Sequence, residues 1–153
     1  MTRAQIGDQA KNFILKDQND QDFNLEDYKG KRVLLSFHPL AFTGVCADQM
    51  KSLEDNQSIF QELNTEAVGV SIDPMPSKLA WAKELGIEKT KLICDFWPHG
   101  EVAQNFGIFR DKNGFSERAN IILDENHKVL FIKTYPLSEL PDINEIIQVL
   151  RDK

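Results

Sequence analysis

The hydrophobic positions of the chain form short continuous runs that alternate with stretches of helical periodicity. A continuous apolar run is typical of a strand buried on both faces of a sheet. Apolar residues three or four positions apart are typical of a helix that packs one face on such a sheet. The predicted central strands are residues 32–37, 67–72 and 91–94, and the predicted helices are residues 46–63, 77–85, 101–106 and 141–150.

Two hairpins complete this pattern. Near the start of the chain, the apolar residues 13–15 and 23–25 flank the polar stretch 17–21, which predicts two strands joined by a turn. Later, residues 119–123 and 129–134 flank a second polar turn. Strand–helix units followed by a hairpin and a terminal helix predict an α/β fold with a mixed central sheet, helices on both faces and an N-terminal β-hairpin.

Length and charge narrow the class of protein. The 153 residues contain no internal repeat, low-complexity tract or linker, which predicts a single domain over residues 1–153. The net charge of −6 argues against nucleic acid or an anionic membrane as partner, because both attract basic patches. The first residues, MTRAQIGDQAKNF, lack the apolar core of a signal peptide, and no apolar run reaches membrane-spanning length. We therefore expect a cytoplasmic protein.

The two cysteines, Cys46 and Cys94, are too few for a disulfide framework of the secreted kind. The chain has no Cys-x-x-Cys pair and no Cys/His pair at zinc-ligand spacing, so neither a structural metal nor another cofactor is expected. In a reducing compartment these cysteines are then either inert or redox-active.

Cys46 stands where the predicted strand 32–37 has ended and a helix begins. Ligands favour this end of a strand in an open sheet, and a cysteine in the first helical turn faces unbonded N–H groups and the positive end of the helix dipole. Both favour the reactive thiolate. Thr43, one turn earlier, is within reach of the sulfur, and Pro39 stiffens the approach and screens the sulfur from water. Position alone leaves open the alternative that Cys46 is a small buried hydrophobic residue.

The spacing Pro-x-x-x-Thr-x-x-Cys, formed by Pro39, Thr43 and Cys46, resembles the active-site signature of the peroxiredoxins, the AhpC/TSA family. The resemblance extends over nearly the whole chain, through GDQAKNF, AVGVSID, DFWPHGEVAQNFGIF, Arg118 and ANIILD. The DFWPHGEVAQNFGI stretch is similar to the alkyl hydroperoxide reductase E type, described as one-cysteine peroxiredoxins. The resemblance implies a thioredoxin-like fold and a thiol-dependent peroxidase that reduces hydrogen peroxide and organic hydroperoxides in antioxidant defence.

The resemblance also implies a role for each matching residue. Cys46 would be the peroxidatic cysteine, which attacks the O–O bond and becomes a sulfenic acid. Thr43 would hydrogen-bond the peroxide and the thiolate, and Arg118 would supply a fixed positive charge for the thiolate and the reacting oxygens. Pro39 would shield the site. The backbone N–H groups of Val45 and Cys46 would be further donors to the peroxide.

Three residues have weaker assignments. Gln49 lies one turn after Cys46, where relatives often carry Glu or Gln, and is expected to support the site; a solvated helix residue is the alternative. His38 precedes Pro39 and is expected at most to line the site, since nothing in the sequence makes it a catalytic base. Without the resemblance, Arg118 would be interpreted as an ordinary surface residue at the start of a strand.

The sulfenic acid must be reduced by a thiol. No cysteine follows within a few residues of Cys46 and none lies in the last residues, IIQVLRDK, so Cys94 is the remaining candidate resolving thiol. A Cys46–Cys94 disulfide would require the helix start to unwind, because bonded cysteines have Cα atoms within about 7 Å. A packing role for Cys94 is the favoured alternative. An external thiol reductant, either a thioredoxin- or glutaredoxin-like protein or a small thiol, would then act on Cys46.

Other functions share part of this chemistry. A peroxide sensor that relays oxidation to a partner protein has the same first step. A thioredoxin-like electron carrier is disfavoured because it needs Cys-x-x-Cys, and a silent binding domain would have no reason to keep Pro39, Thr43, Cys46 and Arg118 together. The resemblance further implies a homodimer, to which the aromatic stretch DFWPHG would contribute; a core position for Trp81, Phe96 and Trp97 is the alternative.

Overall fold

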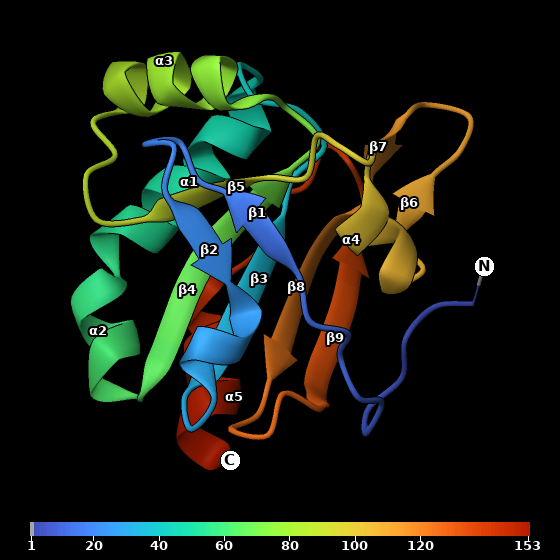
Figure 1. Ribbon diagram of the computed structural model, residues 1–153. Coiled ribbons are helices and arrows are strands. Elements are labelled where there is room, and N and C mark those ends of the chain that lie inside the picture. The colour runs from blue at the N-terminus through green and yellow to red at the C-terminus, as the bar shows by residue number, and fades with distance from the viewer. Residues whose placement is uncertain (1) are drawn as a thin grey trace.

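A five-stranded mixed sheet lies at the centre of the computed structural model, which describes residues 2–153 (Figure 1). Its order is β5-β4-β3-β8-β9. The strands β3 (Arg32–Phe37), β4 (Thr65–Ser71) and β5 (Lys91–Cys94) are parallel, whereas β8 (Arg118–Leu123) and β9 (Val129–Tyr135) run antiparallel to their neighbours. The ends of β3, β4 and β5 and the start of β8 therefore meet at one end of the sheet.

Two small hairpins lie outside this sheet. The predicted N-terminal hairpin is confirmed: β1 (Ile14–Lys16) pairs antiparallel with β2 (Asp22–Asn24), and the 3-10 helix η1 (Leu25–Tyr28) follows. A second hairpin, β6 (Phe109–Arg110) with β7 (Phe115–Ser116), was not predicted. Strands of this length are too short to show a hydrophobic period.

The helices cover both faces of the sheet, as predicted (Figure 1). Within residues 2–153, no helix is both long enough and apolar enough to cross a membrane. The helices are α1 (Gly44–Asp55), α2 (Gln57–Glu62), α3 (Met75–Leu85), α4 (Glu101–Asn105) and α5 (Ile143–Asp152).

Helix boundaries are where the prediction was wrong. The predicted helix 46–63 is two helices, α1 and α2, separated at Asn56. The Asn56 side chain donates to the carbonyl of Ser52 at 2.8 Å, and asparagine competes in this way with regular helical bonding. Helix α5 begins at Ile143 rather than at 141, because the Asp142 side chain caps it by accepting from the Asn144 N–H at 3.0 Å.

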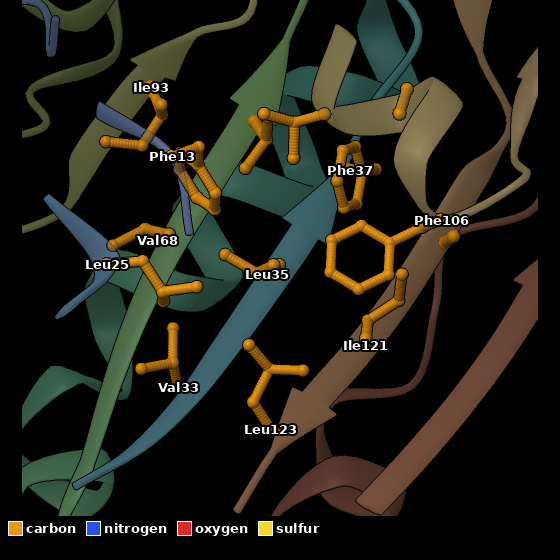
Figure 2. Close-up of a cluster of buried hydrophobic side chains, with 14 of the residues drawn as sticks. Phe13, Leu25, Val33, Leu35, Phe37, Val68, Ile93, Phe106, Ile121 and Leu123 are labelled. Atoms are coloured by element: carbon orange, nitrogen blue, oxygen red, sulfur yellow. The ribbon is translucent and has the colours of Figure 1, made fainter. Parts of the chain in front are cut away.

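Successive side chains of β3 point to opposite faces of the sheet, and each face has its own hydrophobic core. Val33, Leu35 and Phe37 point toward the hairpin β1–β2 and α4, where they pack with residues such as Phe106 (Figure 2). Leu34 points to the opposite face, under α1, α2, α3 and α5. Ser36 shares this second face, so its hydroxyl is buried beneath α1. The end of β3 thus brings one polar group under the helix that carries Cys46.

Candidate active site

Helix α1 starts just beyond the end of β3 and places Cys46 in its first turn. Thr43 is the N-cap residue, in an extended conformation with φ −119° and ψ 150°. The first bonded N–H of the turn belongs to Ala47, which donates to the Thr43 carbonyl at 2.9 Å. The N–H groups of Val45 and Cys46 precede it and have no helical acceptor, so they form an anion-binding helix start. The Cys46 side chain itself is fully buried.

Arg118, the first residue of β8, reaches the sulfur of Cys46. The pairing of Phe37 with Ala119 brings the start of β8 beside the end of β3. The Arg118 Nη1 donates to Cys46 Sγ at 3.3 Å, and its Nε and Nη2 donate to the Leu137 carbonyl at 3.1 and 2.7 Å. Within residues 2–153 no carboxylate forms an ion pair with this buried guanidinium. Its positive charge is therefore directed at the sulfur.

Gln49 connects Arg118 to the centre of the sheet. Its Oε1 accepts from Arg118 Nη1 at 2.8 Å, and its Nε2 donates to Ser36 Oγ at 2.7 Å and to the Phe37 carbonyl at 3.1 Å. Ser36 Oγ in turn donates to Asn120 Oδ1 at 2.7 Å. Gln49 is only 3% exposed, which excludes the solvated alternative. The sequence reasoning did not identify Ser36 or Asn120, although polar residues inside the apolar strands RVLLSF and RANIIL were a signal that could have shown them.

In the segment between β3 and α1, the hydrogen bond of Thr43 differs from the expected bond to the Cys46 sulfur. The Thr43 hydroxyl donates to the Leu40 carbonyl at 2.9 Å rather than to the sulfur, and its side chain is exposed. The Thr43 oxygen keeps its capacity to accept a hydrogen bond from a peroxide. Pro39 is buried, and the Ala41 N–H anchors the segment by donating to Asp73 Oδ2 at 2.8 Å.

Cys94 ends β5 at the same end of the sheet as Cys46, and both cysteines are free. It is 5% exposed, and burial raises the pKa of its thiol to about 11, so the thiol is protonated at neutral pH. Adjacent strands are about 4.8 Å apart, so the ends of β3 and β5, with β4 between them, are about 10 Å apart. Disulfide formation needs Cα atoms within about 7 Å, which is shorter than this separation of the strand ends.

The arrangement is suited to a cysteine nucleophile whose reaction produces an anion. A buried sulfur faces a fixed cation, Arg118, and two backbone donors at a helix start. Such preorganised groups stabilise both the thiolate and negative charge that develops on a neighbouring oxygen. Within residues 2–153 no cluster of His, Cys, Asp and Glu side chains is arranged to hold a metal ion.

Known proteins show the same combination of sequence and fold. Residues 6–132 match the AhpC/TSA family. The chain is 36% identical over 138 residues to "Alkyl hydroperoxide reductase E" of Mycobacterium tuberculosis, covering 90% of each chain. It is 32% identical over 147 residues to "Thioredoxin-dependent peroxide reductase, mitochondrial" of Drosophila melanogaster, covering 92% of this chain and 61% of that one. The crystal structure of the reduced 2-Cys peroxiredoxin of Plasmodium vivax matches with a TM-score of 0.88 at 27% identity, covering 95% and 80% of the two chains.

Proposed function

The chain belongs to the AhpC/TSA family of thiol-dependent peroxidases, and we propose that Cys46 is the nucleophile with which it reduces hydrogen peroxide and organic hydroperoxides. The observation that carries this assignment is the 3.3 Å contact of Arg118 Nη1 with Cys46 Sγ at the start of α1. Cys94 makes no such contact with an arginine; its neutral thiol donates only weakly, to the Leu92 carbonyl at 3.9 Å.

The thiolate of Cys46 attacks one oxygen of the peroxide. An S–O bond forms while the O–O bond breaks, so the sulfur becomes a sulfenic acid and the leaving oxygen takes a proton to become water or an alcohol. Arg118 and the N–H groups of Val45 and Cys46 stabilise the charge on the two oxygens. Thr43 hydrogen-bonds the peroxide, and Pro39 limits the access of water. Because Cys46 is fully buried, peroxide entry requires the segment ahead of α1 to move.

An external thiol completes the cycle. It attacks the sulfenic acid to form a mixed disulfide and water, and a second thiol then releases reduced Cys46. The burial of Cys94, its raised pKa and its position two strands from β3 favour this route over an internal disulfide. A thioredoxin-like protein is the proposed reductant, since one relative is named for thioredoxin dependence. We propose the cytoplasm as its site of action, where a thiol pool keeps both cysteines reduced.

A mass measurement tests this cycle. Fully reduced protein is treated with a stoichiometric dose of hydrogen peroxide in the presence of dimedone, which traps sulfenic acids. We expect a single dimedone adduct, located on Cys46 by peptide mapping, with Cys94 unmodified. The Cys94→Ala variant should give the same adduct. Loss of a pair of hydrogen atoms without an adduct would mean that Cys94 resolves Cys46, and it would contradict the one-cysteine cycle.

We also propose that the protein is a homodimer. The side chains of Ile14, Phe96 and Trp97 are 56%, 47% and 76% exposed, and they gather around a hollow lined also by Leu15 and Met75. Exposed apolar groups that cluster in this way are typical of protein–protein interfaces. Because Phe96 and Trp97 closely follow the end of β5, a second copy of the chain would pack close to the sheet end that carries the active site.

Replacing Trp97 should weaken this dimer. For Trp97→Lys we expect sedimentation velocity to show a monomer at concentrations where the unmodified protein is a dimer, because a charge would be desolvated in the interface. Ile6→Lys is the control, since Ile6 is 72% exposed but does not line this hollow. Equal sedimentation of the Trp97 variant and the unmodified protein would exclude this patch as the interface.

A further inference from the structure

The segment that joins β3 to α1, residues 38–43, is held in place by groups that have no role in the steps above. Ala41, near its middle, is 7% exposed and belongs to the same buried cluster as Cys46. The next residue, Phe42, has φ 63°, in the left-handed region that a bulky side chain rarely adopts. Such a backbone conformation persists only where surrounding groups hold it, so the contacts of this segment call for a functional explanation.

The backbone of the segment is held by the carboxyl group of Asp73, in the connection between β4 and α3. Its Oδ2 accepts from the Ala41 N–H at 2.8 Å and from Ser71 Oγ at 2.6 Å. Ser71 is the last residue of β4, which pairs with β3 as far as Phe37, so the carboxylate is fixed at the end of the sheet where the segment starts. In the described residues 2–153, no other side chain accepts a hydrogen bond from a backbone N–H group of the segment.

Helix α3 contacts the segment on either side of this hydrogen bond. Ahead of it, Lys78 Nζ is 2.6 Å from His38 Nε2, and both side chains are fully buried. After it, the ring of Phe42 lies 6.2 Å from the buried ring of Trp81, at an interplanar angle of 41°. The hydrogen bond therefore fixes the turn between two supported side chains, and this turn leads into Thr43 at the N-cap of α1.

We propose that Asp73 is a positioning residue for peroxide reduction: by accepting from Ala41, its carboxylate keeps the segment closed, with Pro39 and Thr43 beside the first turn of α1. This inference rests on the function proposed for Cys46. When the hydrogen bond is absent, the segment opens more often, which exposes Cys46 but moves Pro39 and Thr43 away from the reacting peroxide. Reagents then reach Cys46 more easily, whereas peroxide reduction becomes slower, because only the closed fraction has these groups in position.

Alkylation and peroxide reduction, measured on the same variants at pH 7, test this role. N-ethylmaleimide is neutral and larger than hydrogen peroxide, so it reaches the buried Cys46 only when the segment opens. In Asp73→Ala we expect Cys46 to be alkylated about tenfold faster, the usual effect of losing a hydrogen bond to a charged group. Single-turnover reduction of hydrogen peroxide should be about tenfold slower. Arg118 contacts the sulfur from β8, so the thiolate keeps this cation in the variant.

Asp73→Asn is the matched control, because it removes the same carboxylate but keeps an oxygen that can accept from Ala41. Both of its rates should stay within about twofold of the original, as should those of Asp55→Ala, at an exposed position of α1. Peptide mapping also follows Cys94, whose alkylation should stay slow in every variant. If circular dichroism shows that Asp73→Ala does not fold, Asp73→Ser takes its place, since the serine hydroxyl is one bond shorter and does not reach the Ala41 N–H.

Unchanged alkylation of Cys46 in the variant that loses the acceptor would overturn the inference, as would an Asp73→Asn variant that behaves like Asp73→Ala. Faster alkylation without slower peroxide reduction would likewise overturn it. Equal acceleration at Cys46 and Cys94 would do the same, because that pattern indicates a general loss of stability. Failure of the proposed function is distinct: it would appear as peroxidase activity that survives Cys46→Ser, and it would not alter the alkylation rates.

Discussion

Replacing Cys46 by serine is expected to abolish peroxide consumption, with a loss of at least about a thousandfold in the second-order rate constant. Serine keeps the size of the side chain, but its hydroxyl is not ionised at neutral pH and cannot attack the O–O bond. Neither Arg118 nor the start of α1 can compensate, because they stabilise an anion that serine does not form. The measurement is the disappearance of hydrogen peroxide with dithiothreitol or a thioredoxin system as reductant.

Cys94→Ala is the matched control for this result. Its thiol is buried, its raised pKa keeps it protonated, and it makes no hydrogen bond to Arg118, so the rate should stay within about twofold of the original. Activity retained in Cys46→Ser would remove Cys46 from the mechanism. Sustained turnover of the unmodified protein with a reductant would also separate a peroxidase from a relay, which needs a partner protein for each oxidation.

Replacing Arg118 by alanine is expected to slow peroxide reduction by about a hundredfold to a thousandfold, the usual cost of removing a preorganised donor from a site of developing charge. The variant loses the hydrogen bonds from Arg118 to Cys46 Sγ, to Gln49 and to the Leu137 carbonyl. The two oxygen acceptors left unpaired should also lower the free energy of unfolding by about 1–3 kcal/mol. Single-turnover oxidation at 25 °C, with stability measured in parallel by urea unfolding, separates the two effects.

Companion variants show whether charge or geometry is lost. Arg118→Lys keeps a positive charge but cannot form the forked bonds to Leu137, so we expect a smaller loss of about tenfold. Gln49→Leu keeps Arg118 but removes the acceptor that orients it, and it should also fall between the original and Arg118→Ala. Arg151→Ala, at an exposed position in α5, should leave the rate unchanged. A rate for Arg118→Ala within twofold of the original would exclude the proposed role.

Much of the fold could be predicted from the sequence because its buried strands are short, continuous runs of apolar residues. The strands β3 and β5 were placed at their observed bounds, and β4 within about two residues. The break between α1 and α2 was missed because it depends on one competing side-chain bond from Asn56, which interrupts an otherwise helical apolar pattern. The order of the strands does not follow from such patterns, since any of several pairings would bury the same apolar faces.

For the candidate site too, some residues could be placed from the sequence and others could not. Pro39, Thr43 and Cys46 lie close together along the chain, so their spacing alone placed a cysteine at a helix start after a buried strand. Arg118 is 72 positions from Cys46, and only the antiparallel pairing of β3 with β8 brings it to the sulfur. From its local surroundings in the sequence it would have been interpreted as a surface residue.

The sequence by itself thus determined that Cys46 lies at the start of a helix after a buried strand, and it carried the motifs of the family to which the chain belongs. The tertiary structure decided which groups contact the Cys46 sulfur and its surroundings: Arg118 at the sulfur, Gln49 behind Arg118, and Cys94 two strands from β3. The physical reason is that electrostatic stabilisation depends on distance and on desolvation. Both are properties of how distant segments pack, and a local pattern of residues does not specify them.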